Sequence, residues 1–127
     1  MSNIIRVVTF IILGLVPSFF GSITTVYSEE TKRIGILIDG PYWENEVLIS
    51  NVKKELAKLN GNRYSIVYPP ETVLNGEHDS ALIEKHALQM VDDQDLDVIL
   101  TIGTQSASTF SNMDSLSVPV VAMSVQF

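Results

Sequence analysis

The stretch DVILTIGTQSA, residues 97–107, decides the fold more than any other part of the sequence. Its first half is a short run of β-branched and apolar residues, which is typical of a strand buried on both faces of a parallel sheet. Gly103 then permits a tight turn, and Thr104 is a candidate N-cap for a helix that follows at once. A strand, a turn and a helix in direct succession indicate an α/β protein.

The same alternation extends from residue 33 to residue 125. We expect strands at residues 33–39, 64–68, 97–102 and 118–125, and helices at residues 44–59, 80–93 and 104–111. Pro69 and Pro70 close the second strand, and we expect a polar loop from there to about His78. Apolar residues at helical spacing predict the inward faces of the two longer helices: Leu48, Val52, Leu56 and Leu59 in the first, and Ile83, Ala87, Met90 and Val91 in the second.

Strands that are joined by helices pair in parallel with right-handed crossovers, which predicts a doubly wound, Rossmann-like sheet with the strand order 2-1-3-4. The first helix then lies alone on one face, and the other two helices cover the opposite face. On the first helix's side, nothing from this chain covers the third and fourth strands. The fourth strand is also a bare apolar edge, which predicts self-association, poor solubility or completion by an element outside this sequence.

The amino terminus has the pattern of a secretory signal peptide over residues 1–28. Arg6 precedes an apolar run at residues 7–20. Small and medium-sized residues at positions 26–28 then suit recognition by a signal peptidase, which predicts cleavage after Ser28. We therefore expect one exported domain, residues 29–127, in the periplasm or another extracytoplasmic space. An uncleaved membrane anchor is the alternative, because residues 7–27 are just long enough to span a bilayer.

The composition excludes several classes of function. The 127 residues, 46% of them hydrophobic, provide one modest core. The net charge is -7 and the eight basic residues are scattered, which disfavours nucleic acid as a partner. The chain has no cysteine, so disulfide scaffolds, cysteine-based zinc sites and thiol catalysis are excluded together.

Candidate ligand contacts follow the first and third predicted strands, because open parallel sheets bind ligands beyond the carboxyl ends of their strands, where the strand order reverses. The amides at the start of the third helix suit a carboxylate, a phosphate or a hydroxyl-rich ligand, and aromatic residues after the first strand can stack on a ring. The candidates are Asp39, Tyr42, Trp43, Thr104, Gln105 and Ser106.

Five of the six candidates also have a plainer structural interpretation. Thr104 and Ser106 can cap their own helix, Trp43 can pack against the first helix, and Asp39 can simply end its strand. Tyr42 can simply be exposed.

No catalytic or metal-binding pattern is present in the sequence. It has no nucleophile elbow, phosphate loop or dinucleotide fingerprint, and we expect no enzyme activity and no cofactor. His78 and His86 lack a metal-binding spacing and are expected to be solvated. Four aspartates at positions 92, 93, 95 and 97 lie at the amino end of the third strand and are interpreted as a solvated helix end.

Three stretches resemble one protein family: RIGILID at 33–39, DVILTIGTQSA at 97–107 and VPVVAMSV at 118–125. They are similar to the amino-terminal lobe of ABC transporter substrate-binding proteins, in the type 1 periplasmic binding protein superfamily. The resemblance covers about residues 33–125. It implies an exported protein that captures a small ligand, such as an amino acid or a sugar, and delivers it to a membrane permease. The six candidates above are the positions onto which the family's ligand contacts carry over.

The chain also departs from that family. Family members continue through a hinge into a second lobe, whereas this sequence stops at Phe127, and it lacks the Asp-Pro pair that commonly follows the fourth strand. The resemblance therefore implies one lobe of a two-lobed protein, as a short protein or a fragment.

Other classes of function remain as alternatives. A sensory lobe that serves a membrane signalling protein would have the same fold. A phosphoacceptor receiver domain shares the strand order but needs an acid where Gly103 stands, and an exported enzyme would need a nucleophile beside a base.

Overall fold

The computed structural model describes residues 29–41 and 43–123. The predicted signal peptide and residues 124–127 lie outside this part of the chain. Every predicted strand and helix is present, although some bounds differ. The elements are β1 (Thr31–Ile38), α2 (Trp43–Asn60), β2 (Ser65–Val67), the short 3-10 helix η1 (Pro70–Thr72), β3 (Val73–Asn75), α3 (Ser80–Asp92), β4 (Val98–Ile102), α4 (Thr104–Ser111) and β5 (Val120–Met123).

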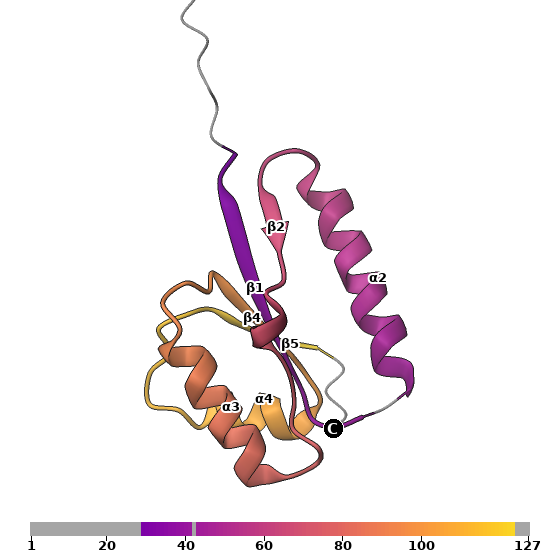
Figure 1. Cartoon of the computed structure of the whole chain (residues 1–127). Helices are drawn as coiled ribbons and strands as arrows, with labels where there is room; N and C mark the ends of the chain where they lie inside the picture. The colour runs from indigo at the N-terminus through magenta and orange to yellow at the C-terminus, as the bar shows by residue number, and fades with distance from the viewer. Residues whose placement is uncertain (1–28, 42, 124–127) are drawn as a thin grey trace, which may run out of the picture.

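The sheet is parallel, and its order is β2-β1-β4-β5. This is the predicted order 2-1-3-4. The long strand β1 pairs with β4 from Ile34↔Val98 to Ile38↔Ile102. On its other side, β1 pairs with β2 in its first half and with β3 in its second half. The fold is therefore a parallel α/β sheet of the Rossmann-like kind (Figure 1). Its second strand is in two pieces, β2 and β3.

The expectation of a polar loop between Pro69 and His78 is wrong in part, because this segment contains β3. The two prolines cannot donate to the β1 ladder, which explains why β2 stops before them. The main-chain N–H and the hydroxyl of Thr72 then both donate to the carbonyl of Pro69, which closes a tight turn. After that turn, Val73 and Leu74 rejoin β1.

The helices are distributed over the two faces as predicted. The expectation that nothing covers the third predicted strand on the first helix's side is wrong, because Leu100 and Ile102 of β4 are buried in the core under α2. Figure 1 shows α2 on one side and α3 with α4 on the other. Alternate residues of β1 separate accordingly: Leu37 packs in the core under α3 and α4, whereas Ile34 and Ile36 pack in the core under α2. The inward residues predicted for α3 are confirmed, since Ile83, Ala87 and Met90 are buried and Val91 packs against them.

The predicted inward face of α2 is only partly right. Leu48, Val52 and Leu56 pack against the sheet, but Leu59 is 77% exposed and Ile49 packs in the core instead. Helical periodicity identifies the face of a helix that turns inward. It does not show how far along the helix the neighbouring sheet extends.

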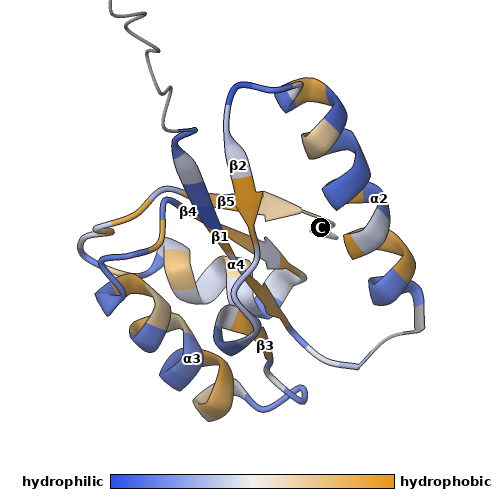
Figure 2. Cartoon of the chain, turned by 45° about the horizontal axis from the view of Figure 1, so that its top comes forward, coloured by the Kyte–Doolittle hydropathy of each residue, from blue (hydrophilic) through white to orange (hydrophobic). Residues whose placement is uncertain are grey.

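Strand β5 is an open edge within the described part of the chain, where it pairs with β4 alone. Val121 pairs with Leu100, whose side chain lies in the core under α2, yet Val121 itself is 48% exposed. Figure 2 shows β2 and β5 in hydrophobic colours, whereas the helices carry residues of both kinds. No helix among the described residues is long and apolar enough to cross a membrane.

Candidate functional site

Three loops meet at the carboxyl edge of the sheet, and main-chain hydrogen bonds of β1 and its continuation join them. Ile38 accepts from the N–H of Gly76 at 2.8 Å, and the carbonyl of Asp39 accepts from the N–H of His78 at 2.7 Å. The N–H of Asp39 donates to Ile102 of β4 at 3.0 Å. The loops after β1, β3 and β4 therefore form one surface, which we call the carboxyl edge.

The side chain of Asp39 caps α4 from a distant part of the sequence. One carboxylate oxygen accepts from the N–H of Gln105 at 2.8 Å, and the other accepts from the N–H of Ser106 at 2.7 Å. These amides belong to the first turn of α4, where the helix itself offers no acceptor. Asp39 is only 7% exposed, and no side chain at the N-cap position makes a capping bond.

This arrangement corrects the predicted roles of Thr104 and of the two amides. The N-cap residue is Gly103, and Thr104 is the first residue of α4. The amides that we expected to face a ligand donate to Asp39 instead. Ser106 is fully buried, and its hydroxyl donates to the carbonyl of Gly103 at 3.5 Å, which agrees with its plainer structural interpretation.

Gly103 is the residue that makes room for this cap. Its φ of 115° and ψ of 168° lie in a region that essentially only glycine adopts. A Cβ atom at this position would lie 2.3 Å from the carboxyl carbon of Asp39. The tight turn was predicted from the sequence, but its reason is the close approach of the Asp39 carboxylate.

Thr104 and Gln105 are exposed and line a hollow beside the cap, between the start of α3 and the first two turns of α4. The hollow has a volume of about 350 Å³, within the range of small-molecule sites. All of its lining side chains are neutral and carry a hydroxyl or an amide: Ser80, Thr104, Gln105, Ser108 and Thr109. We call it the hydroxyl hollow.

The aromatic candidates are not tested. Trp43 begins α2, while its side chain and the whole of Tyr42 lie outside the described part of the chain. Next to them, the buried side chain of Asn45 donates to the carbonyl of Gly40 at 2.7 Å. The stacking of Tyr42 and Trp43 on a ligand ring therefore stays a prediction.

His78 lies at the carboxyl edge, which the sequence interpretation missed. Its ring covers Gly40, where a Cβ atom would come within 2.1 Å of it. Glu77 and His78 both have positive φ angles, of 52° and 58°, a conformation that is uncommon for residues other than glycine. The side-chain oxygen of Asn75 accepts from the N–H of Glu77 at 2.9 Å and helps to fix the turn. The Asn75-Gly76 pair is the sequence signal that could have marked it.

A larger hollow, of about 550 Å³, lies along α2. All of its lining residues come from that one helix, so no loop at the carboxyl edge contributes to it: Glu46, Ile49, Ser50, Lys53, Lys54 and Ala57. We favour the smaller hydroxyl hollow as the ligand site, because it joins two elements at the edge where parallel sheets bind ligands.

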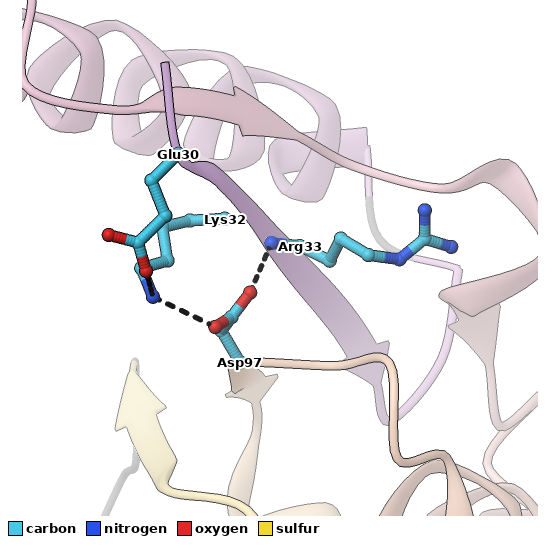
Figure 3. Close-up of polar contacts among 4 residues, drawn as sticks. All are labelled: Glu30, Lys32, Arg33 and Asp97. Carbon is cyan, nitrogen blue, oxygen red and sulfur yellow. Dashed lines mark hydrogen bonds and ion pairs between the residues drawn. The ribbon is translucent and has the colours of Figure 1, made fainter. Parts of the chain in front are cut away.

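The opposite edge of the sheet carries a polar cluster that changes our interpretation of Asp97 (Figure 3). Its carboxylate accepts from the N–H of Arg33 at 2.8 Å and from the ammonium of Lys32 at 3.1 Å, and Lys32 also pairs with Glu30 at 2.6 Å. Asp97 is thus more than a solvated helix end, since it fastens β4 to β1. The amide of Arg33, followed by Lys32, lowers the pKa of Asp97 below its ordinary 3.8.

No group of three or more histidine and acidic side chains among the described residues could hold a metal ion. Comparison of the chain with protein-family models, curated proteins and solved structures finds no match.

Proposed function

We propose that this chain is a ligand-binding lobe of an exported ABC transporter substrate-binding protein, of the type 1 periplasmic binding protein superfamily. The observation that carries the proposal is the meeting of three loops and the hydroxyl hollow at the carboxyl edge of a parallel sheet ordered β2-β1-β4-β5. This is where open α/β sheets bind their ligands. The resemblance at residues 33–39 and 97–107 supplies the choice of family.

The edge is suited to binding because hydrogen bonds join the described residues of its loops before a ligand arrives. Asp39 joins the loops after β1 and β4, and Asn45 fastens the first of them to α2. Loops that are already ordered lose little conformational freedom on binding, so more of the interaction energy contributes to affinity. The hydroxyl hollow then provides the hydrogen-bonding groups that orient a small ligand.

The function proposed is binding without catalysis. Asp39, the acid that caps α4 at this edge, gives both of its oxygens to α4, so it holds a helix rather than a reacting proton. The hydroxyl of Ser106 is buried beneath the edge. Both groups are therefore engaged in structure.

A second lobe would supply the facing wall of the site. The open edge of β5 and the exposed side chain of Val121 offer an apolar surface to a covering element. A membrane permease would then receive the ligand from the closed pair of lobes.

Thermal unfolding of the full chain in the presence of single sugars and amino acids tests the proposal. A ligand that binds the folded state raises the unfolding temperature, and the rise grows with the logarithm of the ligand concentration relative to its Kd. We expect Gln105→Ala, in the hydroxyl hollow, to abolish that rise, and Lys54→Ala, in the α2 hollow, to retain it. A rise that only Lys54→Ala abolishes, or hydrolytic turnover that one substitution removes, would contradict the proposal.

Export is tested separately by mass spectrometry of the chain expressed in a bacterium with a periplasm. We expect a mature protein that begins at Glu29. A full-length chain retained in the membrane would support the anchor instead.

A further inference from the structure

Asp39 occupies the position at which α4 would otherwise receive an anion. The first amides of a helix and its dipole together favour negative charge. Here that charge comes from the chain itself, because the two Asp39 oxygens accept from Gln105 and Ser106 at 2.8 and 2.7 Å. A carboxylate with two charge-assisted bonds in a nearly buried place is firmly held.

The position of Asp39 is fixed by its own main chain as well. Its N–H donates to Ile102 and its carbonyl accepts from His78, so the residue is held between β4 and the loop after β3. Gly103 lacks the side chain that would collide with the carboxylate. Movement of Asp39 away from α4 would therefore disturb pairing on both sides of β1.

We propose that Asp39 determines the charge class of the ligand, an inference that rests on the function proposed above. Its carboxylate is the resident anion of α4 and keeps the carboxylate or phosphate groups of a ligand away from the carboxyl edge. An approaching anion meets a like charge and finds both amides already engaged. The ligand instead presents neutral hydroxyl or amide groups to the hydroxyl hollow, as a sugar does.

The test is a titration of the full chain with inorganic phosphate, followed through the amide NMR signals of Gln105 and Ser106. In the wild-type chain we expect no saturable shift of either signal. In Asp39→Ala the amides lose their partner, and we expect both signals to shift and to saturate as phosphate binds.

Asp114→Ala is the matched control, because it removes one exposed negative charge without touching α4. We expect it to behave as the wild-type chain does. If Asp39→Ala does not fold, the titration is repeated with Asp39→Ser, which also removes the charge.

The proposal is overturned if phosphate shifts both signals saturably in the wild-type chain, or if a folded Asp39 variant does not respond. The wild-type arm needs no substitution, so the proposal remains testable even if neither variant folds. The titration also needs no natural ligand, and its failure is therefore distinct from failure of the proposed function.

Discussion

At the scale of single residues, Asp39 joins parts of the chain that are far apart in the sequence. Its side chain bonds to amides 66 and 67 positions away, and Gly103 provides the space for it. The sequence indicated that both residues stand at strand ends. It could not reveal the bond between them, because a cap from a distant residue leaves no local spacing to detect.

Asp39→Ala should lower the free energy of unfolding by about 2–3 kcal/mol, since it leaves the buried amide of Ser106 and the partly buried amide of Gln105 without their partner. Asp79→Ala is the matched control: Asp79 also accepts from two helix amides, those of Ala81 and Leu82, but it is exposed. Water can replace an exposed cap, so this loss should be nearer 1 kcal/mol. Urea unfolding measures both values, and a loss for Asp39→Ala no larger than that for Asp79→Ala would contradict the account.

Gly103→Ala should destabilise the chain for two reasons that can be separated. The backbone conformation costs a non-glycine residue about 1–3 kcal/mol, and the new Cβ collides with the Asp39 carboxylate. In the double variant with Asp39→Ala, no carboxylate is present for the new Cβ to collide with. Gly103→Ala should then cost only the backbone term, so the losses of the two single variants should not add. Strictly additive losses in urea unfolding would show that the collision is unimportant.

At the scale of elements, the amino ends of β1 and β4 are joined by Asp97, at the edge opposite the proposed site. The carboxylate bonds to the main chain of Arg33 and to the ammonium of Lys32, whose side chain is one-third exposed, as is that of Asp97. The hydrogen bond from the N–H of Arg33 lies within the strand pairing. We therefore expect it to contribute more to stability than the exposed ion pair with Lys32.

The free energy of unfolding should therefore fall at acid pH, because protonation of Asp97 removes its contribution. Its pKa is lower in the folded than in the unfolded chain, so its contribution is complete above about pH 4 and is lost as the pH falls through the folded value. Lys32 has a raised pKa from Glu30 and then Asp97, so its contribution is lost only at alkaline pH, above 10.5. Urea unfolding from pH 7 to pH 2 should show a shallower acid decline for Asp97→Asn than for wild type. Equal slopes would contradict this role.

The open edge of β5 should make the chain self-associate. An uncharged edge strand offers unpaired main-chain groups to another chain, and Val121 is half exposed beside them. Val121→Lys should shift size-exclusion elution toward the monomer and leave the unfolding midpoint nearly unchanged. Glu46→Lys, on α2, adds positive charge away from the edge and should leave association unchanged. Association that survives Val121→Lys would place the contact elsewhere.

The elements were largely predictable, and the differences have local causes. Continuous apolar strands and capped amphipathic helices are properties of neighbouring residues, so β1, α3, β4 and α4 follow from the sequence. Strand β3 could not be predicted, because a strand of only three residues has little pattern of its own. It forms because the long strand β1 lies beside it. The exposure of Leu59 likewise depends on where the sheet ends.

At the scale of the whole molecule, the strand order followed from the alternation of strands and helices, because parallel crossovers allow few arrangements. The carboxyl edge followed from that order. The groups found there did not: the amides of Gln105 and Ser106 bind the carboxylate of Asp39, and His78 reaches the edge from the loop after β3, where it was expected only to be solvated. The hydroxyl hollow depends on how α3 packs beside α4 and has no counterpart in any single stretch of sequence.

The most direct test of the account maps the amide NMR signals of the full chain during titration with a ligand selected by the thermal screen. We expect saturable shifts at residues 39–41, 76–80 and 104–109, where the three loops and the hydroxyl hollow lie. Shifts confined to α2 around Glu46, Lys53 and Ala57, with the carboxyl edge unchanged, would contradict it.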